Sequence, residues 1–185
     1  MGVADDPQGY YAASRNPARE RPALEGERAV EVCIVGAGFT GLSAGLELAE
    51  RGHEVLVLEG RGVGWGASGR NGGQIVNGLN ASLEAIGRRY GGATADFVAT
   101  VVQEGGRIIR ERVARYGIAC DLKDGNLFTA FTVRQMKELE EKQALWRRHG
   151  IDNFELLDRA GLARHVRSDA YVGGMLDRSG GHMHP

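Results

Sequence analysis

The sequence predicts an α/β protein with a parallel strand–helix–strand unit near its N-terminus. Residues 29–35 form a nearly continuous apolar run rich in β-branched residues, which is typical of a strand buried on both faces. Residues 40–51 repeat leucine and alanine at helical spacing and stop at a glycine. Residues 54–58 form a second short apolar run. Because such connections are almost always right-handed, we expect the two strands to be parallel neighbours.

The rest of the chain differs from this unit on both sides. Charged residues and prolines without an apolar stretch predict an extended arm over residues 1–28. After residue 80 the pattern changes to mixed helices and strands, which predicts a second domain. The elements expected there are helices at 81–90 and 93–116, a strand or hairpin at 121–132, a helix at 133–149, a strand at 154–157, a short helix at 158–166 and a strand at 171–176.

The composition excludes several classes of function. The chain has 23 basic and 24 acidic residues and a formal net charge of −1, a balance that favours neither nucleic acid nor an anionic membrane as a partner. Its two cysteines, Cys33 and Cys120, are too few for a disulfide framework. No window approaches the roughly 20 apolar residues that span a bilayer. We therefore expect a protein of the reducing cytoplasm, without a targeting segment.

The glycines after the first predicted strand form the pattern G-x-G-x-x-G at Gly36, Gly38 and Gly41. The first glycine allows a tight turn, the second a close approach of pyrophosphate, and the third close packing of helix on strand. Glu59 ends the second strand, where a carboxylate can accept hydrogen bonds from ribose hydroxyls. A tight turn in an unrelated α/β protein is the alternative. The combination of strands, glycines, helix and acid predicts a Rossmann-like unit that binds a dinucleotide.

A second glycine-dense segment, residues 61–74, follows Glu59 directly. Its polar side chains are Ser68, Arg70, Asn71 and Gln74. Such a segment offers backbone N–H groups and small side chains to a large, flat ligand, and an NAD-dependent dehydrogenase has no obvious need for it. The alternative is a flexible surface loop.

Residues 32–74 resemble the flavin-binding start of the D-amino-acid oxidase-like FAD-dependent oxidoreductases, and are most similar to the γ-glutamylputrescine oxidoreductase branch. The segments Tyr10–Ser14 and Gly180–Pro185 also resemble that branch. The resemblance implies a flavoprotein that oxidises the carbon–nitrogen bond of an amine or amino-acid-like substrate, with FAD supplying the redox chemistry. It assigns no catalytic residue in this chain.

The resemblance also implies the cofactor contacts. The first glycine motif would hold the pyrophosphate, Glu59 the adenosine ribose, and Arg61 would lie near the adenosine. The later loop would run past the pyrophosphate and ribityl chain toward the flavin ring. The implied FAD-binding residues are Gly36, Gly38, Phe39, Thr40, Gly41, Glu59, Arg61, Gly66, Ala67, Ser68, Asn71, Gly72, Gly73 and Gln74.

Family members are more than twice this length, so the resemblance implies a truncated, N-terminal fragment. The expected organisation is an arm over residues 1–28, the FAD-binding unit over 29–80, and a helical layer with part of an α+β substrate domain over 81–185. A two-stranded parallel sheet would have exposed edges and little core on one face. We therefore expect marginal stability and weak flavin retention. A C-terminal half on a separate chain is one way to complete the fold.

Two other functions stay open at this point: a dinucleotide-binding fragment without catalysis, and an NAD-dependent dehydrogenase, which the loop disfavours.

Two further features of the sequence have simple structural explanations. His182 and His184 lack a third ligand at a fixed spacing, so no metal site is predicted. Trp65 could cover a cofactor edge or pack within its loop.

Overall fold

The computed structural model describes residues 9–17, 19 and 21–185. The chain forms two compact units, each with its own sheet. The first unit contains the residues up to Gly72 together with His184 and Pro185, and the second is Gly73–Met183. The sequence placed a boundary near residue 80, whereas the units divide after Gly72. The assignment of the three segments as domains of a larger enzyme stays a prediction.

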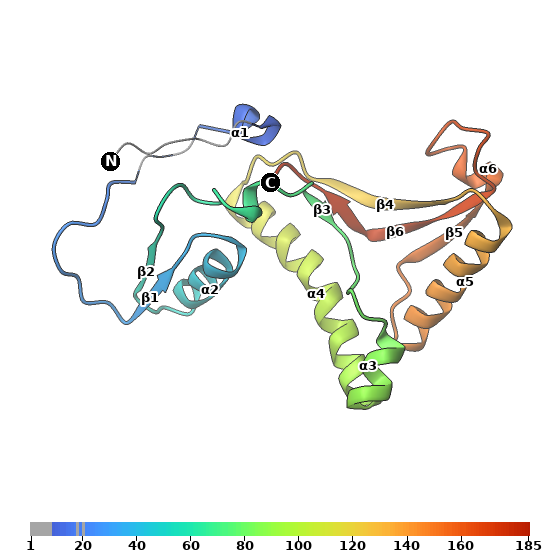
Figure 1. Cartoon of the computed structure of the whole chain (residues 1–185), viewed down its shortest axis with the longest axis horizontal. Helices are drawn as coiled ribbons and strands as arrows, with labels where there is room; N and C mark the ends of the chain where they lie inside the picture. The colour runs from blue at the N-terminus through green and yellow to red at the C-terminus, as the bar shows by residue number, and fades with distance from the viewer. Residues whose placement is uncertain (1–8, 18, 20) are drawn as a thin grey trace. The chain divides into compact units, whose positions relative to one another are not determined.

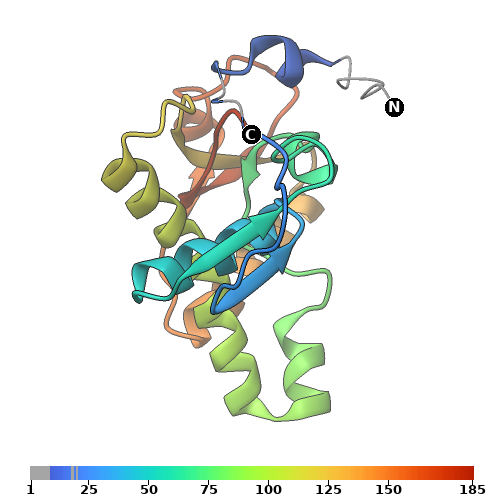
Figure 2. The same ribbon diagram turned by 90° about the vertical axis from the view of Figure 1, so that its left-hand side faces the viewer.

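The first unit contains the expected strand–helix–strand arrangement. Strand β1 (Val32–Val35) is parallel to β2 (Val55–Leu58), and α2 (Phe39–Glu50) connects them (Figure 1). Figure 2 shows the two strands side by side with α2 behind them. A Cβ at Gly45 of α2 would lie 3.1 Å from Val57 Cγ2 and 3.4 Å from Ile34 Cδ1. Glycine therefore lets the helix approach the sheet closely.

The prediction that the first strand is buried on both faces is wrong. Residues alternate along β1 between half-buried and exposed, and Val35 is 87% exposed. The reason is that α2 covers one face of the sheet, and Cys33 and Val35 lie on the other. The exposed face agrees with the expectation of little core on one side of a two-stranded sheet.

The N-terminal arm is not wholly extended, because it contains the short helix α1 (Tyr10–Ser14). Ser14 Oγ donates a hydrogen bond of 2.6 Å to the Tyr10 carbonyl oxygen. The ring of Tyr11 packs edge-on against His184, with ring centres 5.2 Å apart. The arm prediction also covers residues 1–8, 18 and 20, which lie outside the described residues.

The sheet of the second unit is built around one long strand, β6 (Gly173–His182). Strand β4 (Lys123–Ala130) pairs antiparallel with it along one edge. On the opposite edge, β5 (Phe154–Asp158) pairs antiparallel with its first half and β3 (Gln74–Ile75) with its end.

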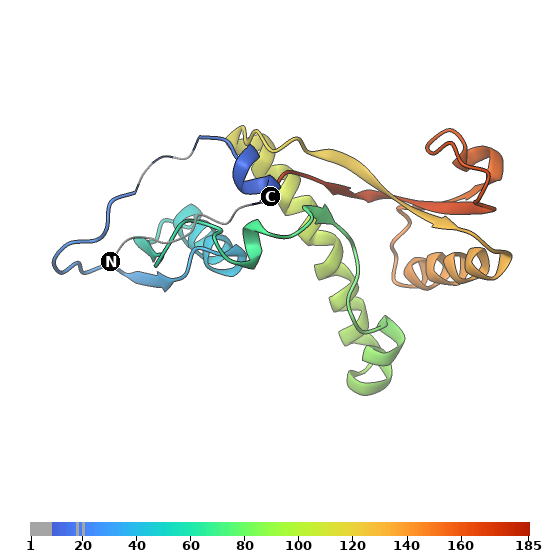
Figure 3. The same ribbon diagram turned by 45° about the horizontal axis from the view of Figure 1, so that its top comes forward.

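Helices α3 (Leu83–Tyr90), α4 (Gly92–Tyr116) and α5 (Val133–Arg148) lie on one side of this sheet (Figures 1 and 3). The short helix α6 (Arg159–Leu162) follows β5. The core lies between these helices and the sheet; its buried residues are Leu83, Ala99, Trp146, Phe154 and Met175.

The sequence predicted most of these elements, with two differences. The residues expected as a strand or hairpin form a strand, β4, which is one of the two predicted alternatives. The last strand runs on to His182, because its glycines allow close neighbours: a Cβ at Gly181 would lie 2.4 Å from the Lys123 carbonyl oxygen. Strand β3 was not expected, since two residues carry no periodic signal.

Candidate functional site

The turn between β1 and α2 has the geometry that its glycines predict. Gly36 has a φ of 100°, a conformation that side chains other than glycine rarely adopt. A Cβ at Gly41 would lie only 1.9 Å from the Gly36 carbonyl oxygen, so glycine is required for α2 to start this close to the strand. A Cβ at Gly38 would lie 3.0 Å from Ser68 Oγ. The three glycines therefore shape a narrow turn.

Glu59 reaches the tip of this turn. One carboxylate oxygen accepts a hydrogen bond of 2.7 Å from the Ala37 N–H, and the other accepts one of 3.0 Å from the Arg61 N–H. These two bonds, with that of Ala37 the stronger cause, lower the pKa of Glu59 below its usual 4.5. Each carboxylate oxygen has two lone pairs, so both can accept a further donor such as a ribose hydroxyl.

The second glycine-rich segment folds back onto the same turn. The Gly64 N–H donates to the Ala37 carbonyl oxygen at 2.9 Å, and Ser68 Oγ accepts from the Phe39 N–H at 2.9 Å. A short 3-10 helix (Ala67–Gly69) carries Ser68, and the Asn71 side chain donates to the Ser68 carbonyl oxygen at 2.7 Å. The segment is thus fastened to the opening turn instead of being a loose surface loop.

Two guanidinium groups of the same segment contact the ring of Trp65. The Cζ atom of Arg61 lies 3.8 Å from the Trp65 ring centre, and that of Arg70 lies 4.3 Å from it. Such cation–π contacts hold both arginines in place. The packing role of Trp65 is therefore visible. The Arg70 contact was not anticipated, although arginine and tryptophan in one short loop are a signal for it.

These elements enclose a hollow of about 510 Å³ within the first unit. Glu59 and Arg61 lie at this hollow together with Gly38 at the start of α2. The first turn of α2 leaves N–H groups available there: those of Thr40 and Gly41 donate to no other residue that the structure describes. A helix N-terminus with free N–H groups favours an anion such as phosphate.

The structure brings together some of the residues that the sequence singled out. Six line this hollow: Gly38, Glu59, Arg61, Gly66, Ala67 and Ser68. Phe39 lines an adjoining hollow of about 610 Å³ with Arg61 and Ser68. Five others belong to the first unit but line neither hollow: Gly36, Thr40, Gly41, Asn71 and Gly72. Gly73 and Gln74 belong to the second unit.

His182 ends β6, and His184 belongs to the first unit. Among residues 9–17, 19 and 21–185, no group of three or more histidine, cysteine, aspartate or glutamate side chains could hold a metal ion. His184 Nε2 instead lies 2.9 Å from Ser14 Oγ. Within the same described ranges, no helix has both the length and the apolar character needed to cross a membrane.

Comparison with known proteins assigns the family. The DAO family, described as FAD dependent oxidoreductase, matches residues 31–185. γ-Glutamylputrescine oxidoreductase of Escherichia coli (strain K12) is 48% identical over 176 residues, which are 95% of this chain and 41% of that protein. The probable oxidoreductase OrdL of Haemophilus influenzae is 42% identical over 177 residues, again 95% of this chain and 41% of that protein. The chain thus spans about two-fifths of the length of these relatives.

Solved structures show the same fold at low sequence identity. L-Amino acid deaminase from Proteus myxofaciens has a TM-score of 0.74 at 18% identity, over 93% of this chain and 37% of that one. L-Proline dehydrogenase from P. horikoshii has a TM-score of 0.66 at 21% identity, over 84% of this chain and 38% of that one. Since the family pattern extends from residue 31 to the last residue, the chain belongs to the DAO family of FAD-dependent oxidoreductases.

Proposed function

We propose that the first unit holds the adenosine diphosphate part of FAD, and that the whole enzyme oxidises a carbon–nitrogen bond of an amine. The observation that carries the proposal is the position of Glu59. Its carboxylate is fixed by the Ala37 N–H, 2.7 Å away, at the edge of a hollow beside the N-terminus of α2. This arrangement offers acceptors for ribose hydroxyls and donors for phosphate within one site.

The residues of the hollow fit the chemistry of this cofactor. The missing Cβ of Gly38 lets the Ser68 side chain lie close to the turn, and the free N–H groups of Thr40 and Gly41 suit a pyrophosphate. We assign Glu59 to the ribose and Arg61 to the adenosine side. The later residues Asn71, Gly72, Gly73 and Gln74 are proposed to follow the ribityl chain toward the flavin ring. Bound FAD supplies the redox chemistry by accepting a hydride equivalent from the substrate.

The amine class rests on the relatives. The E. coli relative, named γ-glutamylputrescine oxidoreductase, is 48% identical to this chain, and this similarity favours γ-glutamylputrescine or a related amine as the substrate.

We propose the cytoplasm as the location, because two cysteines suit a reducing compartment. The family is FAD-dependent, so the nicotinamide alternative is not retained.

Titration of the purified chain with FAD tests the cofactor site. We expect FAD to quench tryptophan fluorescence saturably, since Trp65 lies at the hollow, and NADH to cause no comparable change. Glu59→Gln keeps the side-chain shape and should weaken FAD binding at least about 10-fold, because charged acceptors make the stronger hydrogen bonds. Glu54→Gln, at the opposite end of the second strand, is the matched control and should bind FAD as the unaltered chain does. If both variants bind FAD with equal affinity, Glu59 does not contribute to the cofactor site.

A second candidate function is dinucleotide binding without catalysis. The observation behind it is that the hollow at Glu59 lies wholly within the first unit and offers binding groups, while no catalytic residue is assigned to it. Anaerobic addition of γ-glutamylputrescine to the FAD-loaded chain separates the two candidates. Loss of flavin absorbance eliminates the non-catalytic one, whereas FAD that binds and stays oxidised supports it.

A further inference from the structure

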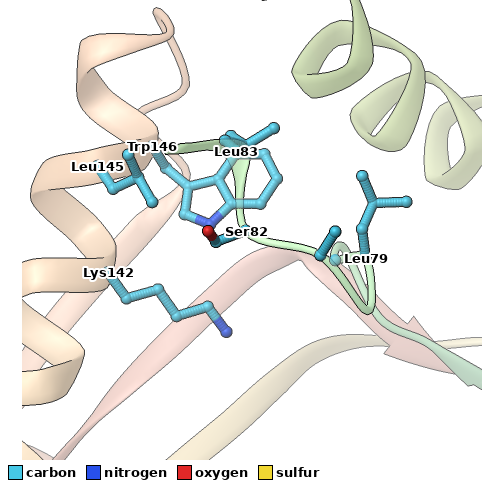
Figure 4. A pocket seen from close by; sticks show the side chains of 8 residues that line it. Leu79, Ser82, Leu83, Lys142, Leu145 and Trp146 are labelled. Carbon is cyan, nitrogen blue, oxygen red and sulfur yellow. The ribbon is translucent and has the colours of Figure 1, made fainter. Parts of the chain in front are cut away.

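The second unit contains an apolar pocket that the cofactor site does not use. It lies between α5 and the segment that connects β3 to α3, and it has a volume of about 190 Å³. Figure 4 shows six of the side chains that line it: Leu79, Ser82, Leu83, Lys142, Leu145 and Trp146. A cavity of roughly 150 Å³ suffices for benzene in another protein, so this pocket has room for one small organic molecule.

Most of the pocket wall is hydrocarbon. Leu83 is buried in the core, while Leu79 is 50% exposed and forms part of the opening. Leu145 belongs to α5, which also supplies Lys142 and Trp146 one helical turn apart, so both point from the same face of that helix. An exposed leucine beside an apolar hollow gains free energy when an apolar group covers it.

The polar groups at the pocket are hydrogen-bond donors. Trp146 is 5% exposed, and its indole N–H has no acceptor among the residues that the structure describes. Figure 4 shows this nitrogen on the edge of the ring that faces the pocket. Ser82 Oγ already accepts the Ala85 N–H at 3.1 Å, which leaves its hydroxyl hydrogen to donate.

Lys142 adds a positive charge without a close counter-ion. Its Nζ atom lies 4.2 Å from the ring centre of Phe128, and no carboxylate of the described part of the chain lies within ion-pair distance. Burial lowers the pKa of Lys142, and the more distant Asp177 offsets part of that shift. A half-buried ammonium is stabilised when a carboxylate reaches it.

We propose that this pocket binds a small apolar monocarboxylate. Its carboxylate faces the Lys142 ammonium and the Trp146 indole N–H, and its hydrocarbon part packs against Leu79, Leu83 and Leu145. A cationic amine of the same size is rejected, because it would place a second positive charge beside Lys142. The site lies wholly within the second unit and does not depend on the proposed function.

Titration of the full chain with hexanoate, followed by the indole N–H signals of its two tryptophans, tests the proposal. The Trp65→Phe variant assigns the remaining signal to Trp146. We expect hexanoate to shift the Trp146 signal saturably. Hexylamine, with the same chain and the opposite charge, and the neutral hexan-1-ol should each bind at least about 10-fold more weakly, as expected for a charge-assisted contact.

Two variants of the same helix complete the test. Lys142→Met keeps the length of the side chain and removes its charge, and it should weaken hexanoate binding at least about 10-fold. Lys137→Met, at an exposed position of α5, should leave binding unchanged. Variants are compared only if their amide spectra retain the native dispersion. Lys142→Arg keeps the positive charge and should therefore still bind hexanoate. The proposal is overturned if hexanoate leaves the Trp146 signal unmoved, if hexanol binds equally well, or if Lys142→Met binds like the unaltered chain.

Discussion

At the scale of single residues, the ionised carboxylate of Glu59 joins two segments of the first unit. It accepts N–H groups from Ala37 in the opening turn and from Arg61 after the second strand. The sequence placed Glu59 at the end of a strand and so predicted its position. It did not predict that the backbone itself would use both carboxylate oxygens, because that depends on how the loop folds back.

The lowered pKa of Glu59 gives a prediction with a definite sign. A carboxyl group whose pKa falls on folding contributes stability above its unfolded value, here 4.5, and loses that contribution as the pH falls through the lower folded value. We expect the side-chain carboxyl signal of Glu59 to titrate below pH 4.5 in NMR, with the Ala37 amide signal following it. A midpoint at or above this value would show that the carboxylate does not hold the turn.

Gly41 gives a second prediction at this scale. A Cβ there would lie 1.9 Å from the Gly36 carbonyl oxygen, so Gly41→Ala forces α2 away from β1. We expect a loss of about 1–3 kcal/mol in the stability of the first unit, the usual range for overpacking. Hydrogen exchange of the β1 and α2 amides measures it. Gly62→Ala is the control, since a Cβ at Gly62 meets nothing within 4 Å, and equal exchange in the two variants would refute the packing argument.

At the scale of elements, the sequence predicted the helices and strands that depend mainly on the local spacing of apolar residues. The amphipathic helix expected at 133–149 is observed as Val133–Arg148, and the run expected at 54–58 is observed as Val55–Leu58. Burial of a strand depends on which elements cover it, so the exposed face of β1 did not follow from its apolar residues. The last strand was expected to end at residue 176, because glycine weakens a strand; in the structure the glycines near the end of β6 allow it to lie close to β4.

The start of α5 supports a prediction about element stability. Thr132 Oγ1 accepts the Gln135 N–H at 3.2 Å, and the Gln135 side chain accepts the Thr132 N–H in return, which forms a capping box. Thr132→Ala should reduce the stability of the second unit by about 1 kcal/mol in urea denaturation, whereas Thr132→Ser should retain most of it. Thr100→Ala, at an exposed position inside α4, should not destabilise the protein. A loss in Thr100→Ala as large as that in Thr132→Ala would contradict a specific capping effect.

At the scale of the whole molecule, the two units differ in how much they bury. The second unit has a cluster of buried residues between its sheet and helices, whereas the first relies on one helix over two strands. A site of about 510 Å³ carried by such a small sheet should bind FAD weakly, so the expected weak retention stays a prediction of this account. Amide NMR detects weak binding residue by residue.

Titration of the chain with FAD, followed by its backbone amide signals, is therefore the most direct test. The account predicts the largest shifts at Ala37, Thr40 and Gly41, with smaller shifts through the segment from Arg61 to Ser68, and little change of these signals in the Glu59→Gln variant at the same FAD concentration. Shifts confined to other parts of the chain, or none up to the solubility limit of FAD, would contradict the claim that this turn and Glu59 hold the cofactor.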